Sequence, residues 1–226
     1  MNDARWTDTV ILVDADYVDK VAFDLTVNFE RMIGRRIPQA DMARWLECVA
    51  LDGGLRPQQH NTHDTQTIES PHDTQTIESP HDTHPTHDTH NAHSAPQIQV
   101  VLLYSHDEMR NFRPGRMADL DGKAFQSELG EFLISCVRVE EMVSMDQLYI
   151  DSLQVLGSAA EVNRLVVVPN AEEIYNKVRE TLRHADQEKR VTLLAMQPME
   201  GGPFRQEILG YSLMAALGIS ADEIKG

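Results

Sequence analysis

The stretch TVILVDADYVDKVAFDLTVNFERMIG, residues 9–34, carries the pattern that decides the fold. Residues 9–13 form a short apolar run rich in β-branched side chains, which is typical of a buried strand. Residues 17–33 place apolar side chains at helical spacing, and Gly34 follows them as a glycine suited to a left-handed helix end. A strand joined to a helix by so short a connection predicts the first unit of an α/β protein.

The same alternation continues along the rest of the chain. A second helix is predicted to start at Pro38, which suits the first position of a helix, and to end at Gly53 and Gly54. Short apolar strands alternating with helices predict a doubly wound, mainly parallel sheet of about five strands with right-handed crossovers. Further strands are predicted at residues 98–104, 131–139, 165–168 and 191–196, and further helices at residues 120–129, 144–156, 171–184 and 204–217.

A tandem repeat at residues 58–96 interrupts this pattern. The motif HDTQTIESP occurs at residues 63–71 and 72–80 and then degenerates into shorter His-Asp-Thr units. The segment contains eight of the ten histidines, no Lys or Arg, and only two large aliphatic side chains. Such a composition cannot bury enough apolar surface to offset the entropy of ordering, so a disordered insert is predicted. One folded domain would then comprise residues 1–57 and 97–226, and adventitious zinc or nickel would bind the insert's histidines.

The composition excludes several classes of protein. A net charge of −16 disfavours loose binding to nucleic acid, although it does not exclude a metal-dependent nuclease with carboxylates at its centre. No apolar run approaches the ~20 residues needed to span a bilayer, and the first residues lack the features of a signal peptide. Cys48 and Cys136 lie inside apolar patterns, as expected for buried thiols in a reducing compartment. We therefore expect a cytoplasmic protein without a membrane partner.

Acidic and polar side chains recur where the predicted strands end. Because ligands of open parallel sheets bind beyond the carboxyl ends of the strands, we expect these side chains to converge on one crevice. Hard oxygen ligands of this kind suit magnesium or manganese. The candidate metal ligands are Asp14, Asp16, Asp146, Asp151, Asn170, Glu172 and Glu173.

Each of these residues also has a purely structural explanation. Asp14 or Asp16 suits the N-cap of the first helix, and Asp146 suits the first turn of its own helix. Glu172 and Glu173 occupy positions where a helix dipole favours acids. Only their convergence in the fold distinguishes a metal site from a set of local caps.

Several of these motifs resemble a known group of nucleases. The run VILVD at residues 10–14, the acids Asp146 and Asp151, and LVVVPNAEE at residues 165–173 are similar to the NYN branch of the PIN-like nuclease superfamily. This resemblance implies a doubly wound sheet and a carboxylate-lined, metal-dependent ribonuclease site that acts on RNA. It also implies magnesium or manganese as the cofactor, with Asp14, Asp146 and Glu172 as the catalytic residues.

The chain departs from the NYN pattern after its fourth predicted strand. NYN proteins usually have a Gly-Asp-x-Asp type motif there, whereas residues 169–172 are Pro-Asn-Ala-Glu, so Asn170 replaces one expected carboxylate with an amide. The alternative is therefore a catalytically degenerate PIN-like module for interaction or regulation. A second resemblance, carried by VDADYVDKVAFDLTVNFERMIGRRIP at residues 13–38, is to an uncharacterised family of Bacteroidetes proteins without an assigned function.

Deletion of residues 58–96, with a short linker in their place, is expected to preserve cooperative unfolding. The repeat has few core-forming side chains, and loop-closure entropy changes by only ~0.6 kcal/mol for each doubling of loop length. Thermal melts of the full chain and the deletion variant test this expectation. A loss of cooperative unfolding in the deletion variant would show that the insert is structural.

Overall fold

The computed structural model describes residues 6–57 and 96–224, so the predicted insert, apart from Pro96, lies outside the described residues. A seven-stranded sheet has the strand order β5-β6-β3-β1-β7-β8-β9, and every neighbouring pair is parallel except β5 and β6. Its strands are β1 (Thr9–Asp14), β3 (Gln97–Tyr104), β5 (Ala124–Ser127), β6 (Gly130–Arg138), β7 (Arg164–Val168), β8 (Arg190–Ala195) and β9 (Arg205–Ile208).

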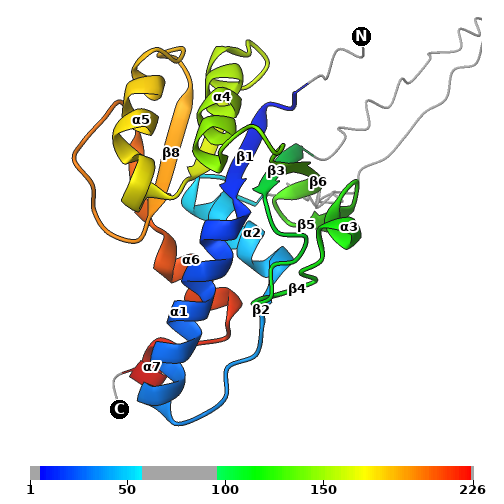
Figure 1. Ribbon diagram of the computed structural model, residues 1–226, viewed down its shortest axis with the longest axis vertical. Coiled ribbons are helices and arrows are strands. Elements are labelled where there is room, and N and C mark those ends of the chain that lie inside the picture. Colours follow the sequence, from blue (N-terminus) through cyan, green and yellow to red (C-terminus); the bar gives the residue numbers. More distant parts are fainter. Residues whose placement is uncertain (1–5, 58–95, 225–226) are drawn as a thin grey trace, which may run out of the picture.

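Helices cover both faces of this sheet (Figure 1). A small two-stranded sheet pairs β2 (Ala40–Asp41) with β4 (Phe112–Arg113). None of the described helices is long and apolar enough to cross a membrane. The helices are α1 (Ala15–Ile33), α2 (Met42–Asp52), α3 (Met117–Leu120), α4 (Met145–Ser158), α5 (Ala171–Arg183), α6 (Leu209–Ala216) and α7 (Ala221–Ile224).

Strand β1 lies at the centre and is buried on both faces. Ile11 and Val13 pack into one apolar core with α1, α2 and α6, whereas Val10 and Leu12 pack into the other with α4 and α5. All four side chains are 0% exposed, which accounts for the continuous apolar run in the sequence, because a strand covered on both faces has no polar side.

The strand order confirms the expected doubly wound, mainly parallel α/β sheet. From β1 the chain builds outward through β3 to β6, and it then returns to pair β7 with the other side of β1. The direction of growth therefore switches between β1 and β7, where ligands bind in such folds. The sheet has seven strands rather than about five, because a short strand is added at each edge.

Two helices predicted from the sequence contain edge strands instead. Residues 120–129 do not form a helix: α3 ends at Leu120 and β5 pairs antiparallel with β6, where Phe125 stacks on Phe132 with ring centroids 4.6 Å apart. The predicted helix at residues 204–217 starts later, at Leu209, because the preceding residues pair with β8 as β9. Neither short segment has a local pattern that reveals its pairing partner.

The second helix also begins later than predicted. Pro38 lies outside it, and α2 starts at Met42 after Asp41, whose carboxylate accepts a hydrogen bond from the Arg44 N–H at 2.9 Å. An aspartate at the N-cap satisfies a backbone donor that has no partner within the helix, and Pro38 offers no such acceptor.

Replacement of Gly130 by alanine is expected to destabilise the protein by roughly 1–3 kcal/mol. Gly130 begins β6 with a φ of 137°, and an added Cβ would lie 2.1 Å from the Pro96 carbonyl oxygen. Gly201→Ala is the matched control, since an added Cβ at that position meets nothing within 4 Å. Urea unfolding measures both changes, and equal midpoints for the two variants would contradict the close approach of β3 and β6.

Candidate functional site

Asp14 occupies the carboxyl end of the central strand β1 and is also the N-cap of α1. Its Oδ1 accepts a hydrogen bond from the Tyr17 N–H at 3.0 Å, and the residue is only 4% exposed. The predicted cap is therefore confirmed for Asp14. The cap occupies one carboxylate oxygen, and so it accounts for only part of this buried acid.

The surroundings of Asp14 disfavour its charged form. Burial raises the pKa of this carboxyl to about 6, the hydrogen bond from Tyr17 lowers it, and the negative charges of Asp16 and Asp146 raise it further. Asp146 lies in the first turn of α4, on the opposite face of the sheet from α1. The fold thus brings together acids from α1, β1 and α4 that lie far apart in the sequence.

Glu172 approaches the same place from the first turn of α5. Burial raises the pKa of Tyr17, and the nearby carboxylates of Glu172 and Asp14 raise it further. The Tyr17 hydroxyl is buried and, within the described chain, makes no hydrogen bond of standard geometry. We call Asp14, Asp16, Asp146 and Glu172 the acidic edge.

Asn170 adds an oxygen at this end of the sheet. It is the N-cap of α5, but its side chain makes no capping hydrogen bond, and its Oδ1 is buried without a partner in the described chain. Buried polar atoms normally have a partner, so an orphaned one needs an explanation such as a bound ion or water. An amide oxygen is also a suitable ligand for a hard cation.

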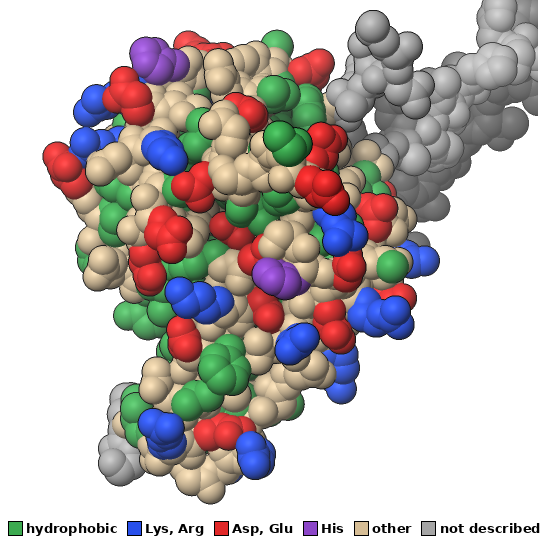
Figure 2. Space-filling model, viewed as in Figure 1, with side chains coloured by type: hydrophobic (Ala, Val, Ile, Leu, Met, Phe, Trp, Pro, Cys, Tyr) green, Lys and Arg blue, Asp and Glu red, His purple; other side chains and the backbone are tan. Residues whose placement is uncertain are grey.

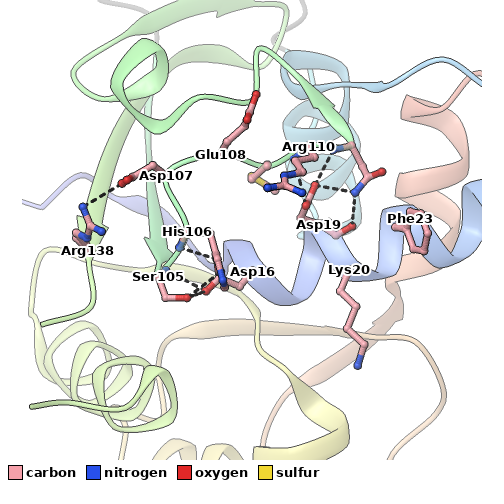
Figure 3. A pocket seen from close by; sticks show the side chains of 12 residues that line it. Asp16, Asp19, Lys20, Phe23, Ser105, His106, Asp107, Glu108, Arg110 and Arg138 are labelled. Carbon is pink, nitrogen blue, oxygen red and sulfur yellow. Dashed lines mark hydrogen bonds and ion pairs between the residues drawn. The ribbon is translucent and has the colours of Figure 1, made fainter. Parts of the chain in front are cut away.

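Asp16 anchors the loop that follows β3 (Figure 3). Its Oδ2 accepts hydrogen bonds from the backbone N–H of Ser105 at 2.9 Å and from the Ser105 hydroxyl, and its Oδ1 lies 3.3 Å from His106 Nδ1. Asp19, one turn later, accepts hydrogen bonds from the backbone N–H groups of Arg110 and Asn111 at 3.1 and 2.8 Å. Asp16 is therefore already engaged by donors.

A pocket of about 1120 Å³ opens between α1 and this loop. Acidic and basic side chains are interspersed across the middle of this face of the molecule (Figure 2). Asp19 and the basic residues of the pocket were not predicted as site residues, although Asp19 shares a helical face with Asp16. The pocket is lined by Asp16, Asp19, Lys20, Phe23, Ser105, His106, Asp107, Glu108, Met109, Arg110, Asn111 and Arg138.

Two of the predicted metal ligands have no described contact with the acidic edge. Asp151 accepts a hydrogen bond from Gln147 Nε2 at 2.8 Å and lines a separate pocket with Trp6 and Val155. Glu173 is exposed in the first turn of α5, and no described hydrogen bond or ion pair joins its side chain to the acidic edge.

The acidic edge is not a ready-made metal cage. Among the described residues, no group of three or more His, Cys, Asp or Glu side chains is arranged to hold a metal ion. Asp146 also forms an ion pair with Lys177, with 3.2 Å between Oδ2 and Nζ. A cation at this edge would need oxygen ligands besides these carboxylates.

Asp14→Asn is expected to flatten the pH dependence of stability. The folded pKa of Asp14 is about 6 against 3.8 for a model carboxyl, so the folded protein binds this proton more tightly than the unfolded chain. Wild-type stability should then fall, by on the order of 3 kcal/mol, as the pH rises from about 4 to about 6. Asparagine removes this loss and still offers Tyr17 an acceptor, so at pH 7.5 the variant should equal or exceed the wild type.

Denaturant melts across this pH range measure the effect. Asp41→Asn is the matched control, because Asp41 caps α2 through the same kind of hydrogen bond but is not fully buried. Parallel profiles for the wild type and Asp14→Asn would contradict the raised pKa.

Comparison with known families places the chain within a defined group. A family model matches residues 3–77 and 86–224, which together cover nearly the whole chain, and the family is described as a family of unknown function, DUF6621. No curated protein and no solved structure matches the chain. The protein with this acidic edge therefore belongs to the DUF6621 family.

Proposed function

We propose that this protein is a divalent-metal-dependent ribonuclease of the PIN/NYN-like kind, with its reaction centre at the acidic edge. The observation that carries the proposal is the environment of Asp14, a buried carboxyl whose pKa is raised to about 6 by burial and by the charges of Asp16 and Asp146. A divalent cation would remove the cost of keeping these acids together. The site also lies at the switch point between β1 and β7, where doubly wound sheets bind ligands.

The donor set suits magnesium or manganese better than a softer metal. Asp14 and Glu172 supply carboxylate oxygens, and the unpartnered Asn170 Oδ1 supplies an amide oxygen. Magnesium is commonly bound by one or two carboxylates, several waters and the phosphate of a substrate, so it does not require a complete protein cage. When bound, the metal would activate water and offset negative charge on the phosphodiester.

The pocket beside the acidic edge supplies groups that could hold RNA. Lys20 and Arg110 form no ion pair within the described chain, and they are available to contact phosphates in a protein of net charge −16. Phe23, which also lines the pocket, is 54% exposed and offers a ring on which a base can stack. These cations and this ring favour a single strand in the pocket.

A non-catalytic interaction or regulatory module is the second candidate. Two observations favour it: Lys177 already neutralises Asp146 at 3.2 Å, and Asn170 stands where a carboxylate is expected. In this alternative, Asp14 acts only as the cap of α1 and Asp16 only as the anchor of the loop after β3.

Cleavage of a fluorescently labelled single-stranded RNA in the presence of manganese tests the proposal. Chelation of the metal should abolish cleavage, and Asp14→Asn should lower the rate by at least roughly 100-fold, because an essential ligand is removed. Asp52→Asn is the matched control. Burial also raises the pKa of Asp52 to about 6, but Asp52 lies at the far end of α2 from its N-cap, beside Glu207 and Arg205, and this variant should cleave like the wild type.

Thermal melts with and without manganese separate the two candidate functions. A manganese-induced rise in melting temperature that Asp14→Asn loses and Asp52→Asn keeps would support the metal site. If manganese shifts no melting temperature and the wild type cleaves no RNA, the nuclease proposal is wrong and the non-catalytic module is favoured.

A further inference from the structure

The amino edge of the sheet gathers arginines from adjacent strands. Arg164, Arg190 and Arg205 are the first residues of β7, β8 and β9, respectively. In the strand register, Arg164 lies opposite Arg190, and Arg205 lies opposite Thr192, two residues beyond Arg190. Paired positions of parallel strands, and positions two apart on one strand, project to the same face of a sheet. All three side chains therefore project to the face that α2 covers, since Val166 and Leu194 share that face.

Two of these arginines approach Gly54, just beyond the end of α2. Its φ is 88°, and a Cβ added there would lie 2.9 Å from Arg164 Nη1 and 3.7 Å from Arg205 Nη1. The two guanidinium groups thus approach the same point from neighbouring parts of the sheet. A side chain at this position would collide with the Arg164 guanidinium, so this packing requires a glycine.

The positive charge at this place is only partly neutralised. Arg164 Nη1 donates to the Gly53 carbonyl at 2.6 Å, and Arg56 Nη1 donates to the carbonyls of Leu51 and Leu55 at 3.0 and 2.6 Å. Within the described chain, Arg205 pairs with Glu207, whereas Arg56, Arg164 and Arg190 form no ion pair with a carboxylate.

Mutual repulsion is evident in the electrostatics of Arg164. Burial lowers the pKa of its guanidinium, and the charges of Arg190, Arg56 and Arg205 lower it further, while Asp8 acts in the opposite direction. Arg164 therefore lies close enough to each of the other three arginines to interact with it. Arginines thus gather at this edge of a chain whose net charge is −16, with the carboxylates Asp8, Asp52 and Glu207 nearby.

A structural role accounts for only two of the four arginines. The negative end of the α2 dipole favours cations, and Arg56 and Arg164 donate directly to its last carbonyls or to those that follow them. Arg190 is exposed, and its side chain has no hydrogen bond or ion pair within the described chain. Arg205 is held by Glu207 on its own strand, with Asp52 at the end of α2 nearby, and its side chain makes no described hydrogen bond to the carbonyls of α2.

We propose that Arg56, Arg164, Arg190 and Arg205, here called the arginine edge, bind a single phosphate group of a small molecule. Guanidinium groups match the oxygens of a phosphate through paired N–H donors, and a terminal phosphate carries more charge than a phosphodiester. The site is separate from the acidic edge, and it does not depend on ribonuclease activity.

The surroundings limit the site to one phosphate. Arg164 and Arg190 also line a polar pocket of about 340 Å³, whose other residues include the carboxylates Asp8 and Glu188. These acids would repel a second phosphate, as in a polyphosphate or a nucleic-acid backbone, but they can accept hydrogen bonds from hydroxyl groups. A hydroxylated phosphate monoester therefore fits the arginine edge better than RNA.

Calorimetric titration of the full chain with inorganic phosphate and with glycerol 3-phosphate, at constant ionic strength, tests this inference. Saturable binding is expected, and the double variant Arg190→Gln, Arg205→Gln should weaken it by at least roughly tenfold, since charge-assisted hydrogen bonds are lost. Arg190→Gln alone should weaken it to a smaller extent and leaves every described hydrogen bond intact. Arg36→Gln is the matched control, because Arg36 is an exposed arginine near the end of α1 and should leave binding unchanged.

Three results would overturn the inference. One is a wild-type protein that shows no saturable binding of either phosphate compound at millimolar concentration. Another is equal affinity in the Arg36 control and in Arg190→Gln, which does not depend on how well the double variant folds. The third is a short single-stranded RNA that displaces glycerol 3-phosphate and whose own binding is weakened by Arg190→Gln, which would assign the arginine edge to a nucleic-acid backbone instead.

Discussion

The burial of β1 on both faces is the constraint on which the rest of the structure depends. β1 runs between two apolar cores, so its side chains from Val10 onward are apolar until the strand reaches its carboxyl end. The first residue of β1 that can carry a charge is Asp14, at that end. The same burial deprives that carboxyl of water and raises its pKa to about 6. The burial of one strand thus sets the electrostatic environment of the carboxyl at its end.

Charges of opposite sign occupy opposite edges of the same sheet. Parallel strands all end at one edge, where α1, α4 and α5 begin, and helix N-termini favour the acids that gather there. The amino edge instead meets the end of α2, and its negative dipole end favours the arginines of β7, β8 and β9. Helix dipoles explain the sign at each edge, but they do not explain the orphaned Asn170 Oδ1.

Asp14 caps a helix in surroundings that disfavour its negative charge. Asp14 Oδ1 caps α1 through the Tyr17 N–H, yet the same carboxyl remains within the field of Asp16 and Asp146. A cap on an exposed helix costs little, whereas this cap places a charge beside two like charges in a buried site. Such an arrangement lowers the stability of the protein when Asp14 is ionised.

Local patterns in the sequence determined the central elements, because apolar periodicity and helix ends depend on neighbouring residues. They located β1 to within one residue and α1 to within two, and they placed Asp14 where the strand ends. Only the tertiary structure decided which acids meet: Asp16 is engaged by Ser105, Asp146 by Lys177, and Asp151 lies beside Trp6. Local sequence patterns also did not predict the edge strands β5 and β9, or that arginines from three strands lie together. Their positions are set by strand pairing between segments distant in sequence, and no short window of residues encodes that register.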